Sequence, residues 1–293
     1  MTLPFRVALT GGGGRLGRAL INELKSRPVE WTAWSRPEYD LDDRQAAHRL
    51  VARDRPALVL HAAAWTDVDG CTRDPELAVR RNGTAVAELA NACVEHGAGL
   101  VLVSTNEVFD GARTDGRGYV EEDHIGPING YGQSKLAGEV ACRAAFAGAR
   151  GAGLWIVRTA WLFGPPGNDF PTKIIAAADR LTPGAALRVV SDEVGSPTST
   201  LDLARAILDL ALKAPGGLYH LAASGHASRL EVAQAIVDRC RPGTLLEKIS
   251  QNEFARTSTP PAWSVLDCSR AAGFGVSLRP WRTALRDYLG DIC

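Results

Sequence analysis

Short apolar segments alternate along this chain with longer segments whose apolar residues recur at helical spacing, and this alternation is the strongest constraint on its fold. The apolar segments are rich in Val, Leu and Ala, as is typical of strands buried on both faces. We predict strands at Phe5–Thr10, Glu30–Trp34, Ala57–Ala62, Gly99–Thr105, Gly153–Arg158 and Gly217–Ala222. Helices are expected at Arg15–Ser26, Asp43–Asp54, Pro75–His96, Tyr131–Ala147 and Arg279–Leu289. Because strand–helix–strand units wind right-handedly, the chain predicts an α/β fold with a doubly wound parallel sheet.

The regular alternation of strand and helix segments ends after about residue 160. A Gly/Pro-rich stretch at Phe163–Gly167 is followed by shorter elements and by a turn-rich segment at Ser191–Ser199. We expect residues 1–160 to form the sheet domain, with segments near 200–222 returning to it. Residues 161–293 are expected to form mainly a smaller C-terminal lobe that closes over the ligand crevice at the carboxyl ends of the strands.

Charge and cysteine usage limit the partners. The 33 Lys and Arg residues balance 33 Asp and Glu residues, so nucleic acid and anionic membranes are not expected partners. No apolar run is long enough for a membrane span, and no leader is recognised, so we expect a soluble cytoplasmic protein. The 6 cysteines form no CxxC pair and indicate neither a metal site nor a disulfide framework. A small-molecule partner is favoured.

The first strand leads into the first helix through a run of glycines. Gly11, Gly14 and Gly17 lie at three-residue intervals in the pattern TGxxGxxG. Such glycines permit a tight turn and a close approach of backbone to a pyrophosphate, and the helix N-terminus supplies N–H donors. A merely flexible turn is the alternative, and the strand–helix alternation that follows favours a dinucleotide-binding site.

The end of the second strand bears on which dinucleotide binds. An NAD site usually has an acidic residue there, whereas this chain has Ser35 and Arg36. Arg36, together with Arg15 in the glycine turn, could pair with a 2′-phosphate and favours NADPH over NADH. Ordinary solvated arginines are the alternative interpretation. Asp40 and Leu41 are candidates for contacts with the adenine edge.

A tyrosine and a lysine share one helix face. Tyr131 and Lys135 are four residues apart at the start of the helix that follows the strand ending in Ser104 and Thr105. A nearby ammonium lowers the pKa of a phenol from its usual value of about 10 and makes it a better proton donor to a carbonyl oxygen. A surface Tyr/Lys pair is the alternative. The glycine turn and the hydroxyl pair favour catalysis.

These motifs resemble the extended form of the short-chain dehydrogenase/reductase superfamily and, within it, the dTDP-4-dehydrorhamnose reductase family. The matching segments span nearly the whole chain in the same order. They are His61–Asp69, Ser104–Gly111, Asn129–Glu139, Arg158–Gly164, Asp192–Thr198 and Gly217–Gly225. The resemblance implies a Rossmann-like fold with a substrate lobe, a nucleotide-diphosphate sugar as substrate and a homodimer as a candidate assembly.

The resemblance also implies residue roles. Tyr131 would donate a proton to the C4 ketone oxygen, Lys135 would hold the nicotinamide ribose, and Thr105 would bond the same ketone oxygen. Trp161 would pack on the deoxysugar, and Asn82 would help to organise a relay water. The cofactor positions are Gly11, Gly14, Arg15, Leu16, Gly17, Ser35, Arg36, Asp40, Leu41, Ala62, Ala63, Ala64, Tyr131 and Lys135.

Three residues depart from the family pattern. Asn106 and Glu107 stand where Asp and Tyr are usual, and both are expected to face the substrate; Glu193 replaces a Gln and adds a negative charge near an anionic ligand. Glu107 leaves open a nucleotide-sugar epimerase or dehydratase, although an Asn cannot deliver the proton that dehydration needs. The last alternative is a non-catalytic, nucleotide-binding regulatory subunit. We rank reduction of a nucleotide-linked 4-keto-6-deoxysugar first.

Overall fold

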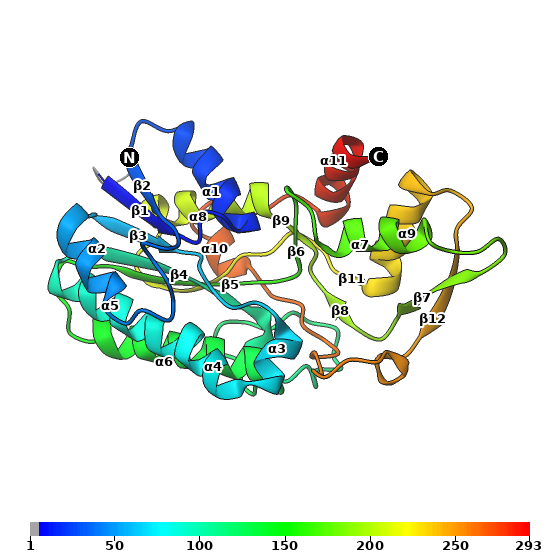
Figure 1. The fold of residues 1–293 in the computed structure, drawn as a ribbon, viewed down its shortest axis with the longest axis horizontal. Helices are drawn as coiled ribbons and strands as arrows, with labels where there is room; N and C mark the ends of the chain where they lie inside the picture. The colour runs from blue at the N-terminus through cyan, green and yellow to red at the C-terminus, as the bar shows by residue number, and fades with distance from the viewer. Residues whose placement is uncertain (1–5) are drawn as a thin grey trace.

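A six-stranded parallel sheet forms the centre of the molecule (Figure 1). The computed structural model describes residues 6–293, so the predicted strand start at Phe5 lies outside the described residues. The strand order is β10-β5-β4-β3-β1-β2, and every neighbouring pair is parallel. The strands are β1 (Arg6–Thr10), β2 (Glu30–Trp34), β3 (Leu58–His61), β4 (Gly99–Thr105), β5 (Leu154–Thr159) and β10 (Gly217–His220). The predicted α/β, doubly wound fold is confirmed.

Helices cover both faces of the sheet, as Figure 1 shows. On one face lie α1 (Arg15–Lys25), α8 (Thr200–Lys213) and α10 (Ser269–Ala272); on the other lie α2 (Ala46–Asp54), α5 (Ala85–Glu95) and α6 (Gly130–Phe146). Alternate strand residues face opposite layers, so that Val7 and Leu9 of β1 join the core under α1 while Ala8 joins the core under α2. Burial of both faces explains why the strands read as continuous apolar runs.

The segment predicted as one helix over Pro75–His96 is three consecutive helical pieces. These are α4 (Pro75–Val79), a π-helical turn η1 (Arg80–Thr84) and α5. Pro75 occupies the first turn of α4, where its missing N–H costs no hydrogen bond. A short helix that the periodicity did not indicate, α3 (Val68–Arg73), precedes them. A 3-10 turn, η2 (Asn106–Val108), follows β4 directly.

Residues beyond β5 form a second group of elements around their own core, at the right of Figure 1. They are β6 (Leu162–Phe163), α7 (Phe170–Ala178), β7 (Ala186–Val190), β8 (Val194–Gly195), β9 (Thr198–Ser199), β11 (Ala227–Ser228), α9 (Arg229–Cys240), β12 (Leu245–Ile249), η3 (Gln251–Glu253) and α11 (Trp281–Ile292). α8 and β10 lie with the central sheet instead. The division near residue 160 into two functional domains stays a prediction.

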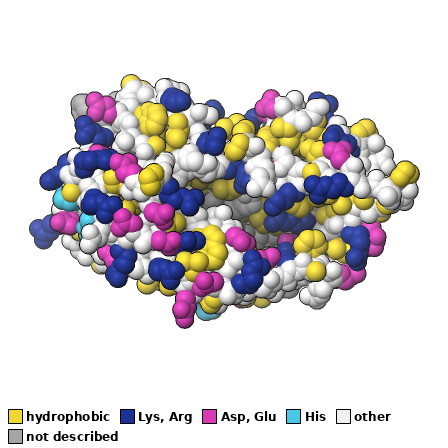
Figure 2. Space-filling model, viewed as in Figure 1, with side chains coloured by type: hydrophobic (Ala, Val, Ile, Leu, Met, Phe, Trp, Pro, Cys, Tyr) yellow, Lys and Arg dark blue, Asp and Glu magenta, His cyan; other side chains and the backbone are white. Residues whose placement is uncertain are grey.

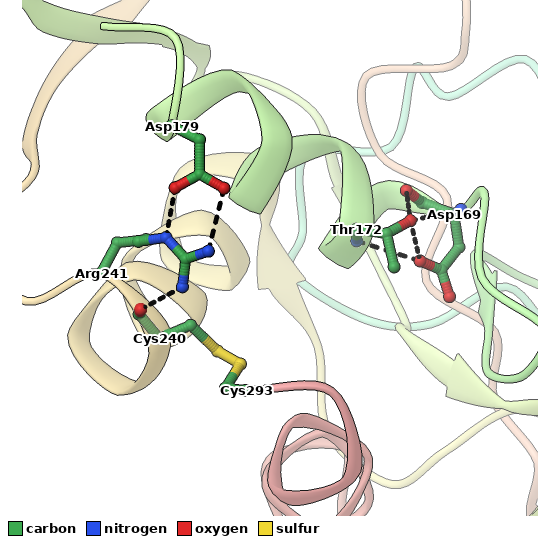
Figure 3. Close-up of a disulfide and its surroundings, with 6 residues drawn as sticks. All are labelled: Asp169, Thr172, Asp179, Cys240, Arg241 and Cys293. Carbon is green, nitrogen blue, oxygen red and sulfur yellow. Dashed lines mark hydrogen bonds and ion pairs between the residues drawn. A yellow bond between two sulfur atoms is a disulfide. The ribbon is translucent and has the colours of Figure 1, made fainter.

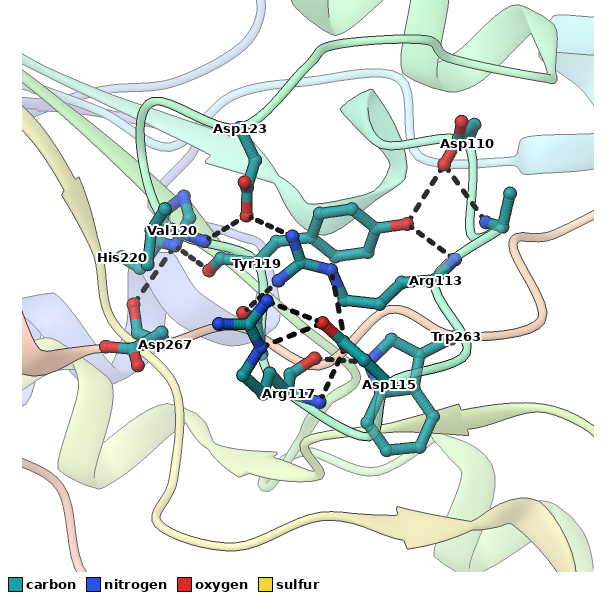
Figure 4. A network of polar contacts seen from close by, with 12 residues as sticks. Asp110, Arg113, Asp115, Arg117, Tyr119, Val120, Asp123, His220, Trp263 and Asp267 are labelled. Carbon is teal, nitrogen blue, oxygen red and sulfur yellow. Dashed lines mark hydrogen bonds and ion pairs between the residues drawn. The ribbon is translucent and has the colours of Figure 1, made fainter.

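The long segment between η2 and α6 is held by its own polar network, shown in Figure 4. Arg113 pairs with Asp123 at 3.0 Å and stacks on the ring of Tyr119, whose hydroxyl donates to Asp110. Trp263 donates its indole N–H to the carbonyl of Arg117. The network orders an irregular segment that lies between Glu107 and Tyr131 in sequence.

The structure corrects the prediction about cysteines. Cys240, at the end of α9, and Cys293, the last residue, form a disulfide with a Cα–Cα distance of 5.4 Å (Figure 3). The two residues are 53 positions apart, and only the packing of α11 against α9 brings them together. Arg241 beside the bridge pairs with Asp179 at the end of α7. The sequence contains no local spacing that could have indicated this pair.

None of the helices in residues 6–293 combines the length and apolar character needed to cross a membrane. Within the same residues, no cluster of three or more His, Cys, Asp or Glu side chains could hold a metal ion.

Candidate active site

The glycine turn after β1 packs directly on the segment after β3. Gly11 has φ +73°, and a Cβ at this position would lie 2.6 Å from the backbone nitrogen of Ala63. A Cβ on Gly17 would lie 2.0 Å from the carbonyl oxygen of Gly11. Neither contact tolerates a side chain, so the chain can turn this tightly only with glycine at both positions. The turn lies at the carboxyl ends of adjacent strands, where ligands bind in this architecture.

A cavity of about 570 Å³ extends from this turn along the end of β2. It brings together most of the residues predicted to bind a cofactor. The lining residues that were predicted are Gly11, Gly14, Ser35, Arg36, Asp40, Leu41, Ala62, Ala63 and Ala64. Gly14 is the N-cap of α1 and supplies no side-chain cap, so the first N–H groups of the helix stay available to an anion.

The cavity also contains residues that the sequence did not indicate as cofactor contacts. Tyr39 lines it from the segment after β2, and Arg81 reaches it from η1. Arg81 makes a two-pronged ion pair with Asp42 and stacks on the ring of Trp65. Asn82 binds both the backbone N–H and the carbonyl of Trp65, and its amide also donates to Ser134 of α6. Asn82 thus holds the wall of the cavity against α6.

Two other predicted cofactor residues do not line this cavity through their side chains. The side chain of Leu16 is buried in the core between the sheet and α8, and Gly17 packs on Gly11. Both lie in the first turn of α1, where only their backbone N–H groups face toward the helix N-terminus.

The Arg15 side chain lies away from the cavity beside β2, and its pairing with a 2′-phosphate stays a prediction. The guanidinium donates to the carbonyls of Gly167 at 3.1 Å and Asn168 at 2.8 Å, and it lines a second cavity rather than the one beside β2. The acceptors lie about 150 positions away in sequence, at the edge of the second group of elements. Arg36 is exposed and remains the candidate for that phosphate.

The second cavity has a volume of about 710 Å³ and lies between the two parts of the molecule. Figure 2 shows the molecule hollowed there, with Lys and Arg side chains beside the hollow. The cavity adjoins the first one along the chain, since Gly14 and Trp65 line one and their neighbours Arg15 and Thr66 line the other. Its lining includes the three residues predicted to contact the substrate, Asn106, Glu107 and Trp161.

Trp161 forms a wall of the second cavity and is held in an unusual backbone conformation, with φ +45°. The guanidinium of Arg229 lies 3.5 Å from the centroid of its ring system. A Cβ on Gly195 would lie 2.5 Å from the same ring, so a glycine is needed behind it. These contacts fix the indole as a flat surface at the cavity.

The negative charge that Glu193 was expected to add near an anionic ligand is paired within the protein. Glu193 is buried and pairs with both Arg256 and Arg229. Burial lowers the pKa of Arg229, and the charge of Glu193 opposes that effect. Two guanidinium groups on one carboxylate leave a local positive charge at this end of the cavity. Elsewhere Arg15 and Lys173 share the lining with carboxylates, which are Asp67, Asp69, Glu107 and Asp169. Only the end of the cavity at Arg229 and Arg256 therefore suits an anionic group.

Tyr131 lies in the first turn of α6, beside the end of β4. The N-cap of this helix is Asn129, whose side chain accepts a hydrogen bond from the N–H of Gly132 at 2.9 Å. Burial raises the pKa of the Tyr131 phenol, and the charges of Glu107 and Cys71 raise it further; only the interaction with the Thr105 hydroxyl lowers it. Thr105 is buried; its hydroxyl donates a hydrogen bond to the side-chain oxygen of Asn106 and accepts one from the backbone N–H of Glu107.

The predicted effect of Lys135 on Tyr131 is therefore not found in this structure. The ammonium donates to the carbonyl of Val103 at 2.7 Å, and it is not among the groups that act on the phenol. Burial lowers the pKa of Lys135 to about 8. The one-turn spacing places the two residues on the same face of α6, but tertiary contacts direct the ammonium toward β4.

A buried ion pair supports this side of the site. Glu139 of α6 accepts two hydrogen bonds from Arg158 of β5, at 2.9 and 2.8 Å, and one from Ser104 of β4 at 2.6 Å. Neither side chain of the ion pair has exposed surface. Ser104 is thus a structural partner of α6, and Thr105 is the hydroxyl left beside Tyr131.

Comparison with known proteins agrees with this geometry. The family model described as RmlD substrate binding domain matches residues 5–293. A Streptomyces griseus protein named dTDP-4-dehydrorhamnose reductase is 39% identical over 98% of this chain and 94% of its own. The Bacillus subtilis spore coat polysaccharide biosynthesis protein SpsK is 34% identical over 98% of this chain and 97% of its own.

A solved structure extends the match to three dimensions. The Bacillus anthracis dTDP-4-dehydrorhamnose reductase in complex with NADP superimposes with a TM-score of 0.90 at 30% identity, covering 99% of this chain and 100% of the other. Family model, relatives and fold agree over essentially the full length. The chain belongs to the RmlD substrate-binding domain family.

Proposed function

We propose that this protein is an NADPH-dependent 4-ketoreductase of a nucleotide-linked 4-keto-6-deoxysugar. The observation that carries the proposal is the pair of adjoining cavities, one lined by the glycine turn and one lined by Trp161 with Arg229 and Arg256. Thr105 and Tyr131 line neither cavity, but Thr105 directly precedes Asn106 and Glu107, which line the second one, and Gly132, next to Tyr131, packs on Glu107. The relatives named dTDP-4-dehydrorhamnose reductase support this substrate class. We expect the reaction in the cytoplasm, and a homodimer stays a prediction.

The residues of the first cavity fit a nicotinamide dinucleotide. The tight turn at Gly11 lines this cavity, and the N-terminus of α1, which has no side-chain cap, supplies donors for the pyrophosphate. Arg36 would pair with a 2′-phosphate, which is why we name NADPH rather than NADH. The NADP bound to the Bacillus anthracis relative supports the assignment. When bound, the nicotinamide supplies the hydride that reduces the ketone.

The chain's own groups handle the proton and hold the sugar nucleotide. Tyr131 donates a proton to the C4 oxygen as it gains charge, and the Thr105 hydroxyl bonds the same oxygen. Lys135 would hold the nicotinamide ribose once it leaves the Val103 carbonyl. Trp161 would pack on the deoxysugar, and the cluster of Arg229 and Arg256 would bind the diphosphate.

Asn106 supports reduction over dehydration. Its amide carries no acidic proton, its oxygen accepts from Thr105, and its nitrogen lies 3.4 Å from the carbonyl of Ser264. An elimination of water requires an acid at the leaving hydroxyl, and this side chain cannot supply one.

The test is NADPH oxidation on addition of dTDP-linked 4-keto-6-deoxysugars, with Tyr131→Phe as the variant. We expect kcat/KM to fall by roughly 10²- to 10⁴-fold in the variant, while NADPH still binds. Unchanged turnover in Tyr131→Phe would refute its role as proton donor. A wild-type protein that binds NADPH but oxidises it with none of the sugars would identify the non-catalytic subunit instead.

A further inference from the structure

Glu107 is a titratable group in the site that ketone reduction does not use. It follows β4 in η2 and lines the second cavity beside the proposed proton donor. One carboxyl oxygen accepts from the amide of Asn129 at 2.7 Å. Its other oxygen has no hydrogen-bond or ion-pair partner among residues 6–293. The carboxyl is thus held at one atom and free at the other.

Close packing fixes Glu107 relative to Tyr131. A Cβ on Gly132, the residue after Tyr131, would lie 2.1 Å from the carbonyl oxygen of Glu107. The Asn129 side chain links Glu107 to the same helix. Its amide nitrogen donates to the Glu107 carboxyl, and its amide oxygen caps the helix that carries Tyr131. These contacts hold the Glu107 carboxyl, which lines the cavity, close to the first turn of α6, which carries Tyr131.

Burial and neighbouring charges both change the pKa of Glu107. Burial raises the pKa of the Glu107 carboxyl, and the negative charge of Glu193 acts in the same direction; the Asn129 bond and the charges of Arg229 and Arg256 oppose them. A carboxylate with a raised pKa holds a proton more firmly than an exposed one and is the stronger base.

We propose that Glu107 catalyses exchange of the hydrogen on a carbon next to the substrate ketone with protons of the solvent. The proposal rests on the proposed function, because Tyr131 must first bond the ketone oxygen. The Glu107 carboxylate takes the hydrogen as a proton, the C–H electron pair forms the carbon–carbon double bond of an enol, and the carbonyl electron pair takes the Tyr131 proton.

The reverse step restores the ketone. Tyr131 recovers its proton, and Glu107 returns to the same carbon a proton that has meanwhile exchanged with water. No oxidant or reductant is consumed. Since one carboxyl removes and returns the proton from one side, the configuration of the carbon is retained, and the reaction is an isotope exchange that accompanies reduction.

The experiment incubates the full chain in D₂O with dTDP-4-keto-6-deoxyglucose and NADP⁺, which cannot reduce the sugar. Deuterium in the recovered sugar nucleotide is measured by mass spectrometry and located by proton NMR, after subtraction of exchange without protein. Reduction of the same sugar with NADPH is measured in parallel, and thermal melting reports the fold of each variant.

The key variants are Glu107→Gln, which keeps the acceptor for Asn129 but is no base, and Glu247→Gln, an exposed carboxylate on β12 paired with Arg188. We expect exchange to fall roughly 10²-fold or more in Glu107→Gln, and by a clearly larger factor than reduction does. Glu247→Gln should exchange as the wild type does. Glu107→Asp, which withdraws the carboxylate from the carbon, should also lower exchange.

Two outcomes overturn the proposal and leave the proposed function standing: wild-type protein that reduces the sugar but exchanges nothing above background, or Glu107→Gln that exchanges at the wild-type rate. If Glu107→Gln melts early, Glu107→Asp decides, and an unchanged exchange rate in that variant again overturns the proposal. A protein that neither reduces nor exchanges refutes both the reductase and the exchange activity.

Discussion

Removing the charge of Glu139 should strongly destabilise the protein. Glu139 and Arg158 have no exposed side-chain surface, and Arg158 donates two hydrogen bonds to the carboxylate. In Glu139→Gln the guanidinium stays buried without its counter-charge, and breaking a buried pair in this way costs about 3–5 kcal/mol. With an unfolding entropy typical of a chain of this length, that cost lowers the melting temperature by about 5–8 °C.

The same ion pair predicts a pH dependence with a defined sign. Burial alone raises the pKa of Glu139, but the hydrogen bonds and charge of Arg158, with Ser104, reverse this and hold the pKa below its usual range. A lowered folded-state pKa contributes stability above the unfolded-state pKa of about 4.3, and this contribution is lost as the pH falls through the folded-state value. The difference between wild type and Glu139→Gln should therefore be full at pH 7 and shrink in acid.

The assay is urea unfolding and calorimetry at pH 7 and in acid, with two comparison variants. Glu247→Gln removes an exposed ion pair with Arg188 and should cost only about 0–1 kcal/mol. The double variant Glu139→Gln/Arg158→Met removes both charges and should recover much of the loss. A Glu139→Gln protein within about 1 kcal/mol of wild type, or a double variant less stable than the single one, would refute the reasoning.

Two further predictions concern contacts between distant parts of the chain. Arg15→Gln loses the guanidinium hydrogen bonds to the Gly167 and Asn168 carbonyls, so the segment beside the second cavity is held less firmly. We therefore expect KM for the sugar nucleotide to rise by a larger factor than kcat falls. Steady-state kinetics that show only a loss of kcat would contradict this role. Cys240→Ser removes a cross-link between α9 and the C-terminus and should lower stability by about 2–4 kcal/mol, as measured by thermal melting with and without reductant. A reductant that leaves the melting temperature of the wild type unchanged would contradict the second prediction.

The local pattern of apolar residues and glycines in the sequence determined the strands and the glycine turn of this protein. The strands at Glu30–Trp34 and Gly99–Thr105 match their predicted bounds, because burial between two helical layers makes parallel strands continuous apolar runs. The glycine turn was predictable for a related reason. The spacing of Gly11 and Gly17 follows from contacts between neighbouring stretches of one turn and helix.

Tertiary structure decided what the charged side chains do. Arg15 turns to carbonyls some 150 positions away, Lys135 turns to the Val103 carbonyl, and Glu193 is neutralised by Arg229 and Arg256. The ends of α9 and α11 meet to join Cys240 to Cys293. Secondary structure arises from interactions within one or two turns, which a sequence displays directly. The partner of a long polar side chain depends instead on which distant segment the fold places within its reach.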